Sequence, residues 1–221
     1  MKKLISLFIL TSSVLLASSC NLTPGKKTES TDSESTSPTT TSDADTNTST
    51  KEITSSYTFY TSKEYLPFDN YGIHISNQSS GYQNRDKLKD SINTQVGTNL
   101  VTSLNVDGCN ILTDDGTANK QHLHLTVGGG SSSGYIEFVL SINIIKVQIE
   151  VIAYYKSTFS LDVNSQVDID GDIHAIPNDS SASTQQVYTF DKTYSNTPNK
   201  FKLSNHDEAQ RFFLESVTLF Y

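Results

Sequence analysis

The sequence lacks the cysteines that a disulfide-stapled extracellular domain requires, because it has only two, Cys20 and Cys109. Small secreted domains without a large core depend on several disulfides, so that class is excluded. Tryptophan is absent too, which removes the largest aromatic face for stacking on sugars. Cys109 is predicted to be a small buried residue, because Val106 and Ile111 are close by and no sequence neighbour would lower its pKa.

Basic residues are outnumbered and do not cluster. The chain has 16 lysines and arginines against 24 aspartates and glutamates, a formal net charge of −8. Affinity for nucleic acid depends on lysine and arginine side chains that displace counterions from phosphates. The sequence therefore predicts no nucleic-acid partner, and the acidic balance favours solubility.

The N-terminal apolar run is too short to span a bilayer. It covers residues 4–16 after Met1-Lys2-Lys3, whereas a spanning helix needs about 20 apolar residues. A basic tip, a short apolar run and small residues before a cleavage point are typical of a signal peptide, here residues 1–20.

The end of this segment, Leu16-Ala17-Ser18-Ser19-Cys20, resembles the lipobox of bacterial lipoproteins. The resemblance implies that Cys20 is diacylated on sulfur and becomes the first mature residue, which would anchor the protein to the extracytoplasmic face of a bacterial cell membrane. The lipobox prefers Leu where this chain has Ala17. The alternative is ordinary secretory cleavage nearby, with Cys20 left as a free thiol.

The next segment, residues 21–52, is predicted to be a disordered tether. Residues 21–50 contain 16 serines and threonines and no aromatic residue, so they cannot bury enough apolar surface to fold. A flexible coil of this length spans about 30 Å. All 11 tyrosines and nine of the ten phenylalanines lie in the remaining residues 53–221, which indicates one folded domain.

Period-two alternation is the strongest local pattern in this domain. It is clearest in residues 145–151, where every odd residue is β-branched and every even one polar. Further strands are predicted over 57–61, 71–76, 123–127, 135–140, 158–163, 187–192, 200–203 and 212–221. Leu88, Ile92 and Val96 recur every four residues, which is compatible with one short amphipathic helix over 86–96. Short strands separated by turns indicate an all-β antiparallel sandwich.

The segments 123–129, 134–138, 145–149 and 211–221 are together similar to a β-sandwich module of surface lipoproteins in Firmicutes and mollicutes. That module also occurs beside secreted endonuclease domains. The resemblance covers roughly residues 120–221 and implies a jelly-roll-like fold. It supplies no catalytic residue.

Two segments resemble catalytic motifs, but the residues around each of them do not fit the motif. Gly130-Ser131-Ser132-Ser133-Gly134 fits G-x-S-x-G, but a nucleophile elbow turns into a helix, and here a strand is predicted to follow. His122 and His124 share a strand face and resemble the start of a cupin metal motif, but the following glutamate ligand is missing. We expect these histidines to face solvent. The sequence predicts neither an enzyme nor a cofactor.

Two further segments offer weaker candidate binding sites. Asp168, Asp170 and Asp172 could offer oxygens to Ca²⁺, although their spacing is not that of an EF-hand, and a polar strand end and turn is the simpler interpretation. Tyr154 and Tyr155 are the most concentrated tyrosine pair and could form a stacking platform.

Together these features predict a lipid-anchored cell-surface protein whose sandwich binds a glycan or a surface protein. Glycans are the leading ligand class, by analogy with other jelly-roll sandwiches. Two alternatives remain open at this point, an accessory lipoprotein of a secreted hydrolase or nuclease system and a purely structural surface protein. A shallow exposed aromatic face would favour binding, whereas a pocket uniting carboxylates and histidines would favour an enzyme.

Overall fold

The structure is a computed structural model that describes residues 52–78, 80–113, 123–128, 133–153, 165–177, 186–205 and 211–221. Residues 48–221 form one compact unit. The predicted signal peptide (1–20), nearly all of the predicted tether (21–52) and the predicted strand at 158–163 lie outside the described residues. No helix in the described part of the chain is long and apolar enough to cross a membrane.

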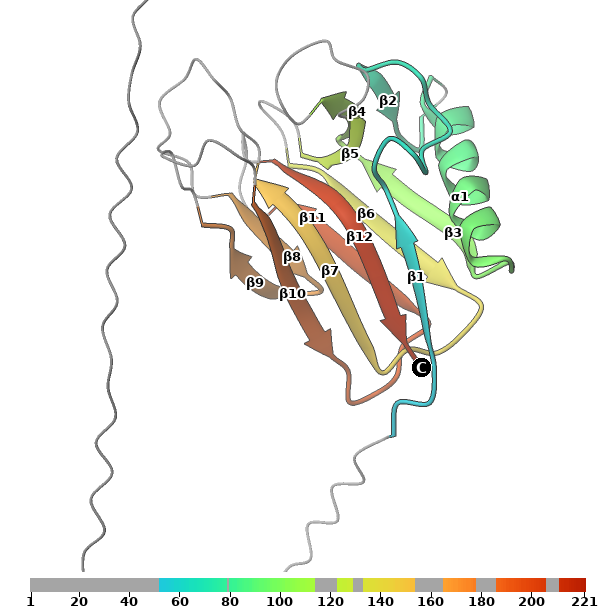
Figure 1. The fold of residues 1–221 in the computed structure, drawn as a ribbon, viewed down its shortest axis with the longest axis vertical. Coiled ribbons are helices and arrows are strands. Elements are labelled where there is room, and N and C mark those ends of the chain that lie inside the picture. Colours follow the sequence, from blue (N-terminus) through green and yellow to red (C-terminus); the bar gives the residue numbers. More distant parts are fainter. Residues whose placement is uncertain are drawn as a thin grey trace, which may run out of the picture. The chain divides into compact units, whose positions relative to one another are not determined.

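The fold is an antiparallel, jelly-roll-like β-sandwich, as predicted (Figure 1). In the seven-stranded sheet, β12 pairs on one side with β7 and on the other with both β5 and β1. Its strands in spatial order are β10 (Val187–Thr193), β7 (Lys146–Ala153), β12 (Phe212–Phe220), β5 (Leu123–Val127), β4 (Cys109–Thr113) and β2 (Ile73–Ile75), with β1 (Ser56–Tyr60) beside β12. The five-stranded sheet has the order β3 (Val101–Asp107), β6 (Tyr135–Leu140), β11 (Lys200–Asn205), β8 (Gln166–Ile169) and β9 (Asp172–Ala175).

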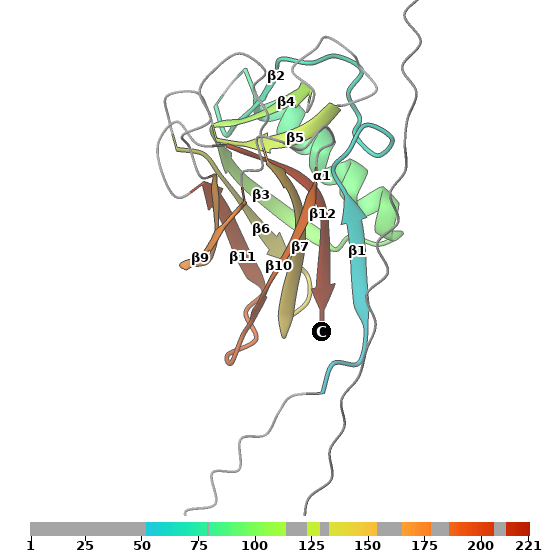
Figure 2. The ribbon, with the colours of Figure 1, turned by 60° about the vertical axis from the view of Figure 1, so that its left-hand side comes forward.

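Alternation along the strands places the core between the two sheets. Figure 2 shows the strands of both sheets after a turn of 60°. The odd residues of β7, Val147, Ile149 and Val151, are fully buried, as the pattern predicted. Aromatic rings join the two layers: Phe138 of β6 lies 5.5 Å from Phe59 of β1, measured between ring centroids. Burial of apolar side chains on this scale is the main source of stability for such a domain.

The helix α1 (Tyr82–Val96) closes one side of the sandwich. It begins four residues before the predicted start and ends at Gly97, whose φ of 70° forms a left-handed C-cap. Leu88 and Ile92 are its buried residues, in line with the predicted apolar stripe. The helix packs against β1 and β2 of one sheet and β3 of the other, so it covers the space between their edges.

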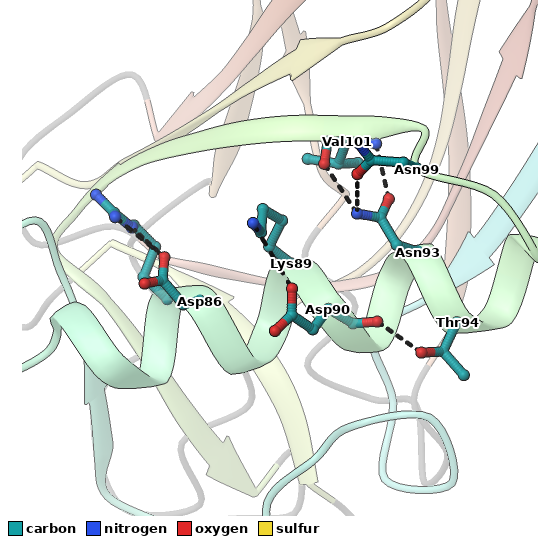
Figure 3. Close-up of polar contacts among 8 residues, drawn as sticks. Asp86, Lys89, Asp90, Asn93, Thr94, Asn99 and Val101 are labelled. Carbon is teal, nitrogen blue, oxygen red and sulfur yellow. Dashed lines mark hydrogen bonds and ion pairs between the residues drawn. The ribbon is translucent and has the colours of Figure 1, made fainter.

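Two amide side chains attach α1 to one strand of each sheet. Asn93 accepts a hydrogen bond from the N–H of Val101 in β3 at 2.8 Å and donates to its carbonyl at 2.9 Å (Figure 3). Gln95 does the same for Tyr60 in β1, at 2.8 and 3.0 Å. Each amide therefore satisfies both polar groups of a strand residue, as a neighbouring strand would.

Neither β3 nor β4 is predicted from the sequence. The burial pattern of β3 breaks the alternation, because the register shifts between Val101 and Ser103 where β3 pairs with β6. A β-bulge of this kind adds a residue to one strand and hides the period of two.

Close backbone approach explains Gly134 in the G-x-S-x-G motif. A Cβ atom at Gly134 would lie 2.5 Å from the nitrogen of Gly128 and 2.6 Å from the carbonyl oxygen of Gly108. Gly108 itself has a φ of 61°. The segment continues into β6 at Tyr135 and not into a helix, so a nucleophile elbow is excluded here.

Candidate ligand-binding face

Several predicted site residues lie outside the described part of the chain. These are the lipidation candidate Cys20, the tyrosines Tyr154 and Tyr155, His122 and the central serine Ser132. Nothing in the structure bears on their roles. The remaining candidates, His124, Cys109 and the three aspartates, are described.

His124 is buried, which corrects the expectation that it faces solvent. Its side chain is 9% exposed, and Nδ1 lies 3.0 Å from Oε2 of Glu215. The strand alternation does point His124 away from Leu123 and Leu125, but Phe213 also packs on that side, 5.8 Å away between ring centroids. Both faces of β5 are therefore covered. The alternation of residues along the strand shows which face a side chain points to, but not whether that face is covered.

Cys109 is buried, as predicted, and its thiol is free. Burial raises the pKa of the thiol well above its usual range, and the nearby Asp107 carboxylate raises it further. A thiol held protonated in an apolar site is a poor nucleophile. Cys109 is a packing residue and carries no part of a reactive site.

Asp168, Asp170 and Asp172 form the predicted strand end and turn, with Val167 and Ile169 buried beside them. The Asp170 carboxylate accepts hydrogen bonds from the Tyr194 hydroxyl at 2.7 Å and the Lys202 N–H at 2.9 Å. Asp168 accepts one from the Gly171 N–H at 2.5 Å. Across the described ranges, no group of three or more His, Cys, Asp or Glu side chains is placed to hold a metal ion. These carboxylates thus stabilise the β8–β9 turn.

Two tyrosines that the sequence reasoning did not single out form an exposed stack beside α1. The rings of Tyr60, at the end of β1, and Tyr65, in the following turn, lie 4.8 Å apart between centroids and 25° apart in plane. They remain 37% and 39% exposed. We call Tyr60 and Tyr65 the tyrosine pair.

The main chain of each tyrosine is held in place by α1. Gln95 bonds both polar groups of Tyr60, and the Ser91 hydroxyl donates to the Tyr65 carbonyl at 2.5 Å. In the same turn, the Lys63 ammonium is bonded to the Phe68 carbonyl and to the Asp69 carboxylate. The tyrosine pair is therefore exposed but preorganised, which lowers the entropic cost of binding a ligand.

A row of polar side chains continues from the tyrosine pair across the sheet. Tyr60 is the register partner of Ser216 in β12, which is opposite Glu150 in β7, and Glu150 is opposite Thr189 in β10. Their neighbours Phe59, Val217 and Ile149 point into the core, so this row points away from the core, although Ser216 itself is buried. The Ser216 hydroxyl donates to Oε2 of Glu150 at 2.7 Å.

A second outward row lies one step along the same strands. It contains Thr58, Thr218 and Gln148, which are register partners across β1, β12 and β7. The hydroxyl oxygens of Thr58 and Thr218 are 2.9 Å apart. We call the side chains of the two rows the outer face, namely Thr58, Tyr60, Ser216, Thr218, Gln148, Glu150 and Thr189.

The opposite side of the sandwich offers a less suitable surface for stacking. In the described strands of the five-stranded sheet, Tyr135 is the outward-facing aromatic residue. The ammonium of Lys202 lies over its ring, 4.6 Å from the centroid, and the Tyr135 hydroxyl donates to Asn105 at 3.3 Å. This ring is already engaged by the protein itself.

The outer face has the chemistry of a shallow sugar-binding surface. Aromatic rings pack against the apolar C–H face of a pyranose, and hydroxyl, amide and carboxylate groups pair with its hydroxyls. A signal for Tyr60 does exist in the sequence: in Tyr57-Thr58-Phe59-Tyr60, alternation puts Tyr60 on the wet side of the strand. Its contact with Tyr65 depends on the turn and could not be inferred.

No family model matches the sequence, and no curated protein matches it with significance. Thirteen chains of solved structures do match. One is a family two carbohydrate esterase from Cellvibrio japonicus, with 17% identity and a TM-score of 0.30, over 53% of this chain and 30% of that chain. Another is BtGH115A, a 4-O-methyl-α-glucuronidase with specificity for decorated arabinogalactans, with 11% identity and a TM-score of 0.32, over 55% of this chain and 17% of that chain. The chain thus spans less than a third of either protein, and likenesses at this level assign no activity.

Proposed function

We propose that this protein is a lipid-anchored cell-surface protein whose β-sandwich binds glycans through the tyrosine pair and the outer face. The observation that carries the proposal is the exposed, preorganised stack of Tyr60 and Tyr65 at the end of a polar strand row. Contiguous exposed apolar surface rimmed by polar residues is typical of ligand-binding and interaction sites.

The surroundings of the tyrosine pair support a sugar over an apolar ligand. Glu150 lies in the same strand row as Tyr60, beyond the buried Ser216, and Thr58, Thr218 and Gln148 form the neighbouring row. These side chains would be poor partners for a lipid tail, because polar groups buried against it would lose their hydrogen bonds to water. They suit the many hydroxyls of a glycan.

The location rests on the N-terminal sequence. Diacylation of Cys20 would hold the domain on the extracytoplasmic face of the bacterial membrane, with residues 21–52 as spacer. A domain displayed in this way meets glycans of the wall or of a host surface. The proposed activity is binding, with no chemical step.

A glycan array tests the proposal, with the mature chain carrying Cys20→Ala so that it is soluble. We expect binding to at least one glycan, and Tyr60→Ala or Tyr65→Ala should weaken it by about tenfold or more, the equivalent of about 1.4 kcal/mol. Tyr71→Ala is the matched control, because Tyr71 is 54% exposed and lies outside the tyrosine pair. Equal losses in all three variants, or unchanged binding in Tyr60→Ala and Tyr65→Ala, would contradict the proposal.

A further inference from the structure

We infer that the outer face selects uncharged glycans, and that the carboxylate of Glu150 disfavours acidic sugars such as uronates and sulfated residues. This inference rests on the proposed function and narrows its ligand class. It follows from the position of Glu150, from the charges around it and from the hydrogen-bonding capacity of a carboxylate.

Glu150 lies where a glycan seated on the tyrosine pair would extend. Tyr60, Ser216 and Glu150 are register partners on three neighbouring strands. Adjacent strands are about 4.8 Å apart, so Glu150 lies about 10 Å from Tyr60 across the sheet. A sugar stacked on Tyr60 would therefore place its next unit beside Glu150.

The Glu150 carboxylate is oriented but not neutralised by the described residues. Ser216 donates to Oε2, and in the described part of the chain no hydrogen bond uses Oε1 and no lysine or arginine is within ion-pair distance. Ser216 is 3% exposed, so its hydroxyl is fixed in the sheet surface. One oxygen is thus held by the protein, and the other can accept from a ligand.

Among the described residues, two lysines near this surface are paired with carboxylates. On β7, Lys146 lies 2.9 Å from the Asp191 carboxylate of β10. In the turn beside the tyrosine pair, Lys63 lies 2.8 Å from Asp69. In each pair the carboxylate offsets the charge of the ammonium, so the attraction of that ammonium for a second anion is weakened.

An ionised carboxylate accepts hydrogen bonds and cannot donate. Its partner on the ligand must therefore be a hydroxyl or an N–H group, which neutral hexoses and N-acetylated sugars provide. A uronate or sulfate group at the same place offers only acceptors and carries a like charge, so it is repelled. Oε1 has two lone pairs, so it can accept hydrogen bonds from two hydroxyls of one sugar.

Matched glycans that differ in charge test this inference. The mature Cys20→Ala chain is probed with an array of neutral oligosaccharides and their uronate or sulfated counterparts. Oligogalacturonates and their methyl esters are included, because esterification removes the charge and keeps the sugar. Calorimetry then measures affinity for the strongest neutral ligand and its acidic counterpart, at low and high salt.

We expect the acidic counterpart to bind at least about tenfold more weakly than the neutral ligand at low salt. The difference in affinity should be smaller at high salt. Glu150→Gln keeps the shape of the side chain and an acceptor for Ser216 but removes the charge. It should therefore reduce the ratio of the two affinities at least threefold. Glu137→Gln is the control, because Glu137 is ion-paired with Lys200 on the opposite sheet and should leave the difference unchanged. Melting temperatures of both variants check the fold.

The possible failures are distinct. Tyr60-dependent binding that prefers acidic glycans, or a preference that Glu150→Gln leaves unchanged, would overturn the role of Glu150 while the proposed function stands. Absence of any Tyr60-dependent glycan binding would overturn the proposed function itself.

Discussion

Gln95 in α1 pairs with the main chain of Tyr60 as an adjacent strand would, accepting from its N–H at 2.8 Å and donating to its carbonyl at 3.0 Å. Tyr60 ends β1, which pairs with β12 on one side. Exposed strand edges invite pairing with other chains, and a side-chain amide at the edge satisfies the groups that would do so. The same contact positions the tyrosine pair.

Substitution of Gln95 should affect both stability and binding. We expect Gln95→Leu to lower the free energy of unfolding by about 1–3 kcal/mol, because two backbone groups lose their partner. Asn93→Leu is the matched control, since Asn93 makes the same pair of contacts with Val101 on the other sheet. Chemical denaturation should show similar losses for both variants, and glycan affinity should fall only in Gln95→Leu. Equal affinity in the two variants would show that Gln95 does not position Tyr60.

A methyl group at Gly134 should be poorly tolerated. Gly134→Ala would place Cβ within 2.8 Å of three backbone atoms, and backbone shifts of this kind cost about 1–3 kcal/mol. Gly171→Ala is the comparison, because Gly171 has a φ of 86° but a Cβ added there would lie in open space. Melting curves of the two variants compare a steric conflict, at Gly134, with backbone strain alone, at Gly171. A Gly134→Ala protein as stable as the wild type would contradict the close approach of Gly108, Gly128 and Gly134.

The Cys109 thiol should be inert in the folded protein. Burial and Asp107 raise its pKa, so the reactive thiolate is scarce at neutral and mildly alkaline pH. In a Cys20→Ala background, a thiol-specific reagent at pH 8 should label Cys109 only after denaturant is added. Rapid labelling of the native protein would show that β4 opens readily or that the thiol is accessible.

The inward and outward faces of β12 should differ sharply in their tolerance of substitution. Leu219 is fully buried, and Leu219→Ala should cost about 2–5 kcal/mol through lost burial and the cavity left behind. Its neighbour Thr218 faces outward, so Thr218→Ala should cost less than about 1 kcal/mol. Urea denaturation measures both. Similar costs at the two positions would argue against the observed register of β12.

Membrane attachment should depend on Cys20. If Cys20 is diacylated, the wild-type protein partitions with detergent and Cys20→Ala is released in soluble form. Phase partition and immunoblotting of cell fractions measure this. Retention of the Cys20→Ala protein in the detergent phase would refute the lipid anchor.

Local pattern was enough to predict much of the sandwich. The alternation in residues 145–151 and the spacing of Leu88 and Ile92 identify β7 and the interior of α1, because burial of one face imposes a period of two on a strand and about 3.6 on a helix. The same reasoning missed β3, where a bulge interrupts the period. It also misplaced His124 in solvent, since alternation reports which face a side chain points to and not what covers that face.

The sequence by itself determined the fold class and the turn at Asp168–Asp172, because strand alternation and turn residues are local patterns in the chain. The buried state of Cys109 was an expectation that the tertiary structure confirmed. Only the tertiary structure decided the candidate site. Tyr60, Ser216 and Glu150 are far apart in sequence and become neighbours through the register of β1, β12 and β7. Register is fixed by the burial of many side chains at once, so no local pattern in the chain could place these three residues side by side.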